Sequence, residues 1–455
     1  MRKKHFLLAS AVILLFMPFG AFAADIPALP EFTKEDRVLI LAPHPDDETL
    51  GSGGVIQRAR DAGARVQVVC YTNGDHNELA FIVYEKRFTF RTGEFLYMGE
   101  VRRSETIKAM SSLGLPAQDM IFLGYPDFGT MAILTLYWNS AKSYRSLMTR
   151  ISKVAYSDTL SPGAPYIGES ILKDLKTTIN NFQPTKIFVS HPADTNRDHQ
   201  SLYLFTRIAL WELEGKIIQP EIYPYLIHVI GWPKPRGHHL DLLLKPPAQL
   251  GGISWKQLIL TDKEAKVKQG LVDFYKSEIE CNPPYLYSYA RKNEIFGDFP
   301  AINLKDNSAG SLAWQSVVVY QEPPEDRSLK GKGKQNLTGL FYAIRGKDLM
   351  IKLDLRRKLD KNLGITINLL GYKKNSDFAA MPKISVTIGL LGMRIRNKAG
   401  IAAANGAKLK FEGRSLIVNL PLATLGEPEK ILTRVKTRAP NFPLEASAWR
   451  ILTIK

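Results

Sequence analysis

The chain has 455 residues, of which 45% are hydrophobic, so its length and composition suit a globular protein of two or three domains. Its two cysteines, Cys70 and Cys281, exclude a disulfide framework. The net charge of +17 is uneven, because residues 305–455 hold 27 Lys/Arg and 12 Asp/Glu, a net of +15. This basic region predicts an anionic partner, either a glycan or an envelope surface; the alternative is a merely soluble basic surface. No nucleic-acid partner is expected.

Residues 1–23 have the pattern of a secretory signal peptide. Arg2, Lys3 and Lys4 precede an apolar stretch from Phe6 to Phe19, and Ala-Phe-Ala at 21–23 fits a cleavage site. The mature chain is then expected to begin at Ala24 and to be secreted or periplasmic. An uncleaved anchor is the alternative, although the stretch is shorter than the ~20 residues of a spanning helix. No transmembrane segment is expected after cleavage.

Residues 30–300 alternate between short apolar strands and helices. Val38–Leu41, a helix over Gly54–Ala62 and Val66–Tyr71 form one strand, helix, strand unit. The same alternation continues with a helix at Glu100–Leu113, a strand at Met120–Leu123, a helix at Ile171–Phe182, a strand at Ile187–Ser190 and a helix at Asp262–Tyr275. This order predicts an α/β fold, a Rossmann-like and mostly parallel sheet with helices on both faces.

Residues 311–455 have a different period. Apolar residues alternate with polar ones over Leu349–Leu355, Ile365–Leu369, Ile384–Ile388 and Leu416–Leu420, which predicts an antiparallel β-sandwich smaller than the first domain. The closing segments 416–422 and 449–452 resemble carbohydrate-binding and DOMON-like sandwiches. That resemblance implies a module for binding an anionic glycan or envelope surface, with a purely structural role as the alternative.

Metal ligands gather where the first strand ends. His44, Asp46 and Asp47 directly follow that strand, and His199 follows the strand at Ile187–Ser190. Because ligands bind outside the carboxyl ends of such strands, these residues are expected to meet there. A catalytic zinc has three protein ligands and an open position, which His44, Asp47 and His199 can provide. Asp46 is then left beside the metal as a general base.

Four segments together resemble the PIG-L or LmbE-like zinc deacetylases. They are Ala-Pro-His-Pro-Asp-Asp-Glu-Thr-Leu-Gly-Ser-Gly-Gly at 42–54, Thr-Asn-Gly-Asp at 72–75, the helix at 102–114 and Asn-Arg-Asp-His at 196–199. The resemblance implies Zn²⁺ as cofactor, with His44, Asp47 and His199 as ligands and Asp46 as base. It also implies that Arg102 and Asp127 hold the sugar of an N-acetylglucosaminyl substrate.

One position departs from that family pattern. Many members have histidine where this chain has Asn196, and an asparagine amide can stabilise an oxyanion but cannot transfer a proton. The proton for the leaving amine then has to come from Asp46 or from the nearby His191. His76, His228, His238 and His239 are expected to be surface or core residues rather than ligands.

The sequence therefore favours an exported zinc-dependent N-deacetylase acting on an N-acetylglucosaminyl glycolipid, glycan or related metabolite. Asn196 keeps open a second interpretation, a catalytically weak or inactive carbohydrate-binding protein of the cell envelope. A zinc hydrolase of another amide or ester is the third.

Overall fold

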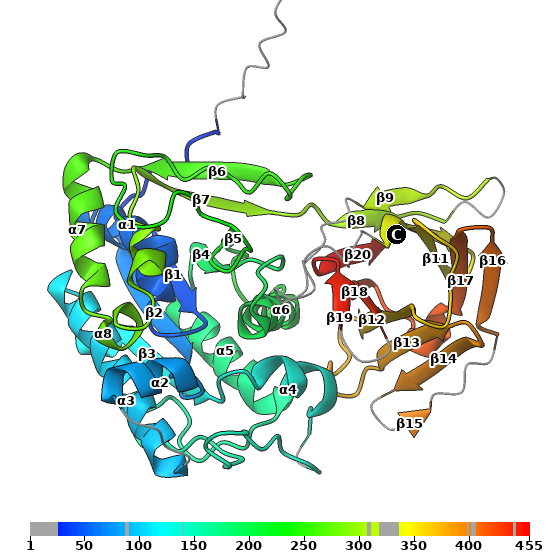
Figure 1. Ribbon diagram of the computed structural model, residues 1–455, viewed down its shortest axis with the longest axis horizontal. Coiled ribbons are helices and arrows are strands. Elements are labelled where there is room, and N and C mark those ends of the chain that lie inside the picture. The colour runs from blue at the N-terminus through cyan, green and yellow to red at the C-terminus, as the bar shows by residue number, and fades with distance from the viewer. Residues whose placement is uncertain are drawn as a thin grey trace, which may run out of the picture.

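A computed structural model describes residues 26–86, 91–139, 141–306, 311–317, 336–397, 400–401, 406–439 and 443–455. The predicted signal peptide lies outside these residues. Two bodies lie side by side: an α/β domain, residues 26–298, and a β-sandwich formed by the described residues of 302–455 (Figure 1). None of the described helices is long and apolar enough to cross a membrane.

The α/β domain is built on a seven-stranded sheet in the order β3-β2-β1-β4-β5-β7-β6. The first five strands in that order are parallel, and the hairpin of β6 and β7 adds an antiparallel edge. The strands are β1 (Arg37–Ala42), β2 (Arg65–Thr72), β3 (Met120–Tyr125), β4 (Lys186–Ser190), β5 (Glu221–Tyr225), β6 (Ser254–Ile259) and β7 (Asn293–Asp298). The predicted Rossmann-like fold is confirmed, with the antiparallel edge as an addition.

Helices cover both faces because the central strands are apolar on both sides. Val38 and Ile40 of β1 pack on the face covered by α1 (Asp47–Asp61), α3 (Thr92–Ser112) and α7 (Asp262–Val272). Leu39 and Leu41 pack on the opposite face, covered by α4 (Thr130–Leu136), α5 (Gly168–Phe182) and α6 (Arg197–Glu212). The remaining helices are α2 (Glu78–Glu85), α8 (Lys276–Ile279) and α9 (Pro283–Tyr287).

The sandwich packs a five-stranded sheet, β16-β17-β11-β10-β9, against an eight-stranded one, β15-β14-β13-β12-β18-β20-β8, in which β19 pairs with β18. Its aliphatic core follows the predicted period of two. Strand β8 belongs to the eight-stranded sheet, although it lies before residue 311, the predicted start of the sandwich. The strands are β8 (Ile302–Leu304), β9 (Gln315–Val317), β10 (Leu337–Arg345), β11 (Asp348–Leu355), β12 (Gly364–Tyr372), β13 (Lys383–Gly389), β14 (Gly392–Asn397), β15 (Gly400–Ile401), β16 (Lys408–Glu412), β17 (Ser415–Pro421), β18 (Lys430–Arg438), β19 (Pro443–Ala446) and β20 (Arg450–Ile454).

The sandwich is docked on α6 through buried contacts. Residues of β12, β18 and β20 share a hydrophobic cluster with α4 and α6. The Tyr372 hydroxyl donates to the carbonyl of Trp211 at 2.9 Å. Arg434 Nη1 donates to Gln200 Oε1 at 2.6 Å, one residue from His199. The two domains therefore share a continuous packed interface next to the His199 segment.

Candidate metal centre

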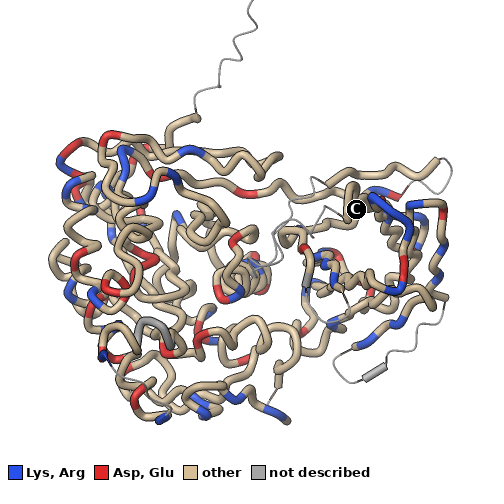
Figure 2. The backbone as a smooth tube through the Cα atoms, viewed as in Figure 1, with Lys and Arg blue, Asp and Glu red and all other residues tan. Residues whose placement is uncertain are grey.

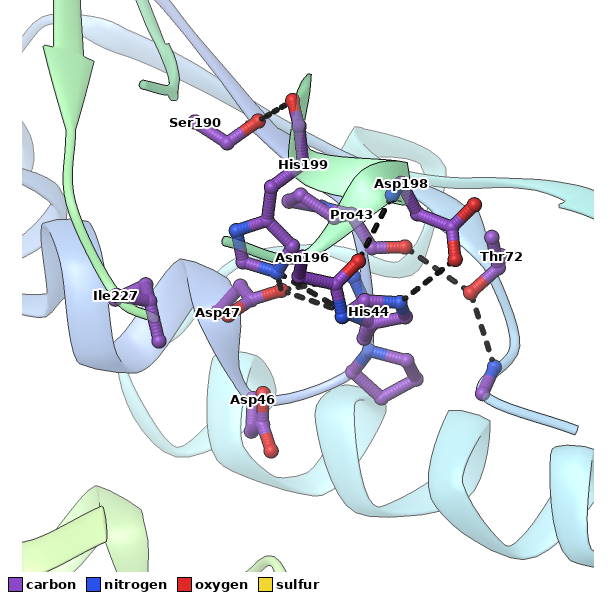
Figure 3. A network of polar contacts seen from close by, with 12 residues as sticks. Pro43, His44, Asp46, Asp47, Thr72, Ser190, Asn196, Asp198, His199 and Ile227 are labelled. Carbon is purple, nitrogen blue, oxygen red and sulfur yellow. Dashed lines mark hydrogen bonds and ion pairs between the residues drawn. The ribbon is translucent and has the colours of Figure 1, made fainter. Parts of the chain in front are cut away.

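Three side chains converge on one point (Figure 3). His44 Nδ1 lies 3.2 Å from Asp47 Oδ2 and 3.2 Å from His199 Nε2, and His199 Nε2 lies 3.0 Å from Asp47 Oδ2. Ligand atoms about 2.1 Å from a tetrahedral Zn²⁺ would lie about 3.4 Å apart. Two imidazoles and one carboxylate at this spacing fit a zinc-type ion, and the cluster is a candidate metal site together with the nearby His228.

The sheet topology explains why these residues meet. The strand order reverses between β1 and β4, and ligands bind at such a switch point, outside the carboxyl ends of the strands. His44 follows β1, Asp47 begins α1, and His199 lies in the first turn of α6. Asp46, just before α1, has a φ of 113°, a strained backbone that costs about 1–3 kcal/mol and is typical of functional sites.

A buried carboxylate lies behind each of the two imidazoles. His44 Nε2 lies 3.1 Å from Asp127 Oδ1, and His199 Nδ1 lies 3.1 Å from Asp194 Oδ2. Such carboxylates fix the orientation of a ligating histidine and raise its basicity. Asp127 therefore contacts His44 directly, in addition to lining the cavity where the sequence analysis expected it to hold substrate.

Asp46 lies beside His44, Asp47 and His199 and has a basic neighbour of its own. Arg102 Nη2 is 3.7 Å from Asp46 Oδ2 and 3.1 Å from Glu278 Oε1. The same guanidinium donates to the carbonyls of Gly74 and Pro45, at 3.1 and 3.0 Å. Arg102 thus connects the turn after β2 to the His44 turn, and it also lines the cavity.

Asn196 is the N-cap of α6, and its Oδ1 accepts from the backbone N–H of Asp198 at 2.8 Å. Because that contact occupies Oδ1, the Nδ2 amide is the end left to donate into the cavity that Asn196 lines. Asp198 accepts from the backbone N–H groups of Phe128 and Thr130, at 2.6 and 3.1 Å, and so holds the start of α4 against α6.

A cavity of about 390 Å³ opens over the cluster. Its lining combines the predicted residues with several that the sequence analysis did not select: His44, Asp46, Asp47, Leu50, His76, Asn77, Arg102, Asp127, Phe128, Asn196, Ile227, His228, Glu278, Tyr285 and Leu286. The structure therefore brings together all seven predicted site residues: six of them line the cavity, and His199 contacts two of those six, His44 and Asp47.

The histidines near this cavity differ in position. His228 lines the cavity, its ring centroid lies 4.7 Å from that of His199, and its Nδ1 lies 3.1 Å from the Tyr285 hydroxyl. His191 instead packs between Trp255 and Phe299 and is not among the lining residues. His228 lies three residues after β5, at the same sheet edge as His44, and that placement was the available signal for finding it.

Burial and neighbouring charges perturb these groups in different directions. Burial alone raises the pKa of Asp47, but His199 and His44 lower it well below its usual value. Burial and the adjacent Asp47 carboxylate raise the pKa of Asp46 well above its usual value. Burial lowers the pKa of His228 to about 4, so its imidazole is neutral near pH 7.

The family model for PIG-L, described as GlcNAc-PI de-N-acetylase, matches residues 39–210. Residues 39–210, called the PIG-L segment below, are similar to this family. The PIG-L segment runs from β1 into α6, so it contains His44, Asp46, Asp47, Asn196 and His199. The sandwich, and the cavity residues from Ile227 onward, lie outside it.

Two proteins similar to part of the chain are named as 1D-myo-inositol 2-acetamido-2-deoxy-alpha-D-glucopyranoside deacetylases. The protein of Mycobacterium sp. (strain KMS) is 33% identical over 117 residues, which is 26% of this chain and 36% of that protein. The protein of Rhodococcus opacus (strain B4) is 38% identical over 81 residues, 18% of this chain and 27% of that protein. The chain thus spans about a third of the length of the curated relatives it matches.

Solved structures are similar at a lower level. The N,N'-diacetylchitobiose deacetylase from Pyrococcus horikoshii has a TM-score of 0.36 and 19% identity, covering 58% of this chain and 84% of that one. A conserved protein from Thermus thermophilus has a TM-score of 0.34 and 18% identity, covering 56% of this chain and 84% of that one. At these scores the similarity adds nothing to the fold described above.

Proposed function

We propose that the chain is a zinc-dependent N-deacetylase that hydrolyses the acetamide of an N-acetylglucosaminyl group in a glycolipid, glycan or related metabolite. The observation that carries the proposal is the convergence of His44 Nδ1, Asp47 Oδ2 and His199 Nε2 next to Asp46, whose side chain is not part of that cluster. The match of residues 39–210 to the PIG-L family model and the names of the relatives support the substrate class.

The proposed reaction replaces the C–N bond of the acetamide with a C–O bond from water and releases acetate and a free amine. Zinc, when bound, supplies a Lewis acid that polarises the carbonyl and increases the acidity of water. Asp46 accepts the proton of the attacking water, and Arg102 holds the Asp46 turn through the Pro45 carbonyl. Asn196 Nδ2 donates to the oxygen that gains negative charge.

Protonation of the leaving amine is assigned to Asp46. Asn196 has no proton to transfer, and His191 lies outside the cavity lining, between Trp255 and Phe299. Asp46 faces the cavity and receives a proton in the preceding step, so it can return that proton to nitrogen. His228 also lines the cavity, and its neutral imidazole can hydrogen-bond to the acetamide or the sugar.

Metal content and acetate release test this proposal together. Purified protein is expected to hold one zinc per chain and to release acetate from at least one N-acetylglucosaminyl substrate, such as a glucosaminyl inositol or a chitooligosaccharide. His199→Ala should lose both properties, whereas His238→Ala, which changes a histidine outside the cavity, should keep both. Zinc-loaded protein that binds N-acetylated sugars without releasing acetate would instead establish the carbohydrate-binding function.

Export through the segment 1–23 is part of the proposal. The basic start, the apolar stretch and Ala-Phe-Ala at 21–23 support it. Mass spectrometry of the protein recovered from an exporting host is expected to give an N-terminus at Ala24. A full-length mass from the membrane fraction would favour the uncleaved anchor.

A further inference from the structure

The hairpin between β13 and β14 carries two exposed leucines at its tip. Gly389 pairs with Gly392, so the turn consists of Leu390 and Leu391 alone. Leu390 is 56% exposed and Leu391 is 103% exposed. Tight hairpin turns usually hold glycine, asparagine or aspartate, and their side chains face water. Two adjacent leucines at such a tip form an unusual apolar point on the surface.

Arginines surround this tip on the outer face of the eight-stranded sheet. Arg394 and Arg396 of β14 and Arg438 of β18 are exposed, and they line a hollow of about 310 Å³ together with Leu391 and Met393. They share the outer face because alternate residues, such as Ile395 and Val435, point into the sandwich core. We call Leu390, Leu391, Arg394, Arg396 and Arg438 the hairpin patch.

No acidic residue balances this charge within the hairpin or near it in sequence. The sequence contains no Asp or Glu between Asp377 and Glu412, a segment that includes all of β13 and β14. Figure 2 shows Lys and Arg along this lower part of the sandwich. The β13–β14 hairpin therefore carries a positive charge that no acidic residue of its own segment neutralises.

The position of the patch leaves it free of the α/β domain. The other end of the same outer face is occupied, since Arg434 contacts Gln200 and Leu432 packs in the cluster shared with α4 and α6. Strands β14 and β15 form the edge of the sheet, at the bottom of the sandwich in Figure 1. One end of this outer face thus packs against the α/β domain, whereas the end with the hairpin patch remains exposed.

From these features we propose that the hairpin patch binds the surface of an anionic phospholipid bilayer, with the two leucines inserted among the headgroups and the arginines paired with lipid phosphates. Apolar insertion and basic residues near the surface both strengthen peripheral binding to anionic membranes. An anionic polysaccharide would use the arginines, but it offers no apolar phase for two exposed leucines. A lipid surface accounts for both halves of the patch.

Sedimentation of the full chain with vesicles tests the proposal. Binding is expected to vesicles of phosphatidylglycerol and phosphatidylcholine, weakly or not at all to phosphatidylcholine alone, and less in high salt because the charges are screened. Arg394→Gln with Arg396→Gln should weaken partitioning about 20- to 30-fold, from about fivefold for each basic residue. Leu390→Ser with Leu391→Ser should weaken it by about tenfold or more.

Matched controls distinguish a specific role of the hairpin patch from the effect of removing any positive charge or any exposed leucine. Lys408→Gln with Lys410→Gln removes the same charge from β16 of the other sheet, and Leu147→Ser removes a leucine that is 72% exposed in the α/β domain. Both should bind vesicles like the unchanged protein. Equal losses in the control and patch variants would overturn the proposal. So would release from vesicles by inorganic phosphate at constant ionic strength, or binding to an anionic polysaccharide with none to vesicles.

Discussion

The two domains bury polar groups in different ways. The α/β domain buries a large group of acids and histidines around the carboxyl ends of β1 and β4, whereas the sandwich core is aliphatic. The buried charged residues in the described part of the sandwich are Lys383, Arg434 and Arg450, and each contacts the domain boundary. Lys383 lies over Trp138, Arg434 contacts Gln200, and Arg450 lies over Phe299. Buried charge thus surrounds the candidate metal site in the α/β domain, which also buries structural pairs such as Lys268 and Glu294, whereas in the sandwich it lies at the docking interface.

The functional use of buried charge in the α/β domain is tested most strongly by a substitution at Asp46. Asp46→Asn keeps the shape of the side chain and removes the base, so we expect kcat to fall about 10²–10⁴-fold while zinc content is unchanged. Because Asp46 is buried next to Asp47, removing its charge should leave the melting temperature equal or higher. Normal turnover by this variant would show that another group is the base and that Asp46 is structural.

A buried ion pair under α1 tests the structural use of charge in the same domain. Lys268 Nζ lies 2.6 Å from Glu294 Oε1, and that carboxylate also accepts from the backbone N–H of Gly54 at 2.7 Å. Lys268→Met leaves Glu294 buried without its cation, so unfolding free energy in urea should drop by about 3–5 kcal/mol. Adding Glu294→Gln should restore part of the loss. No recovery would mean that lost packing, rather than the uncompensated charge, causes the effect.

A substitution at Arg434 tests whether this buried charge of the sandwich stabilises the contact between the two domains. Arg434→Gln removes a charge-assisted hydrogen bond to Gln200 and should lower unfolding free energy by about 1.5–3 kcal/mol. Arg438→Gln, an exposed change on the same strand, should stay within about 0.5 kcal/mol. Denaturation followed by tyrosine and tryptophan fluorescence measures both. Equal stability of the two variants would contradict a contribution of this contact to docking.

The smallest effect is expected in the first turn of α7. Burial raises the pKa of Glu264, but hydrogen bonds from Arg58 and Thr261 outweigh it and bring the pKa down to about 2 from its ordinary 4.5. A lowered carboxyl pKa stabilises the fold above about pH 4.5, and this contribution is lost as the pH falls towards 2. Glu264→Gln should cost up to about 1 kcal/mol at pH 7 and less below pH 4.5. A pH-independent difference in urea unfolding would refute the charge effect.

Much of the fold and of the site could be predicted, because both depend on local patterns. The apolar runs of β1, β2 and β4 and the residues directly after them follow strand geometry, so the meeting of His44, Asp47 and His199 was expected. The helix predicted from Gly54 instead begins at Asp47, so that Asp47 and Glu48 form its first turn, and Ser52, with a φ of −145°, interrupts it. The residue types of this segment did not predict that kink.

Long-range placement is what the sequence could not predict. His228 was expected to be a surface or core residue, yet it lines the cavity because the segment after β5 folds back towards His199. Asp127 and Asp194 contact the imidazoles of His44 and His199 because the ends of β1, β3 and β4 lie close together. The docking of the sandwich on α6 depends on pairs such as Tyr372 and Trp211, which are 161 residues apart.

The pairing of β20 with β8 has a consequence for how the protein forms. Leu452 is paired with Ile302, so the eight-stranded sheet joins segments that lie far apart in the chain, and the docking face on β18 lies directly beside β20. Contacts of this range form slowly, because the intervening chain must lose entropy before the pairing stabilises it. The α/β domain is therefore expected to complete its core first, and the sandwich to assemble afterwards with α6 as a preformed template.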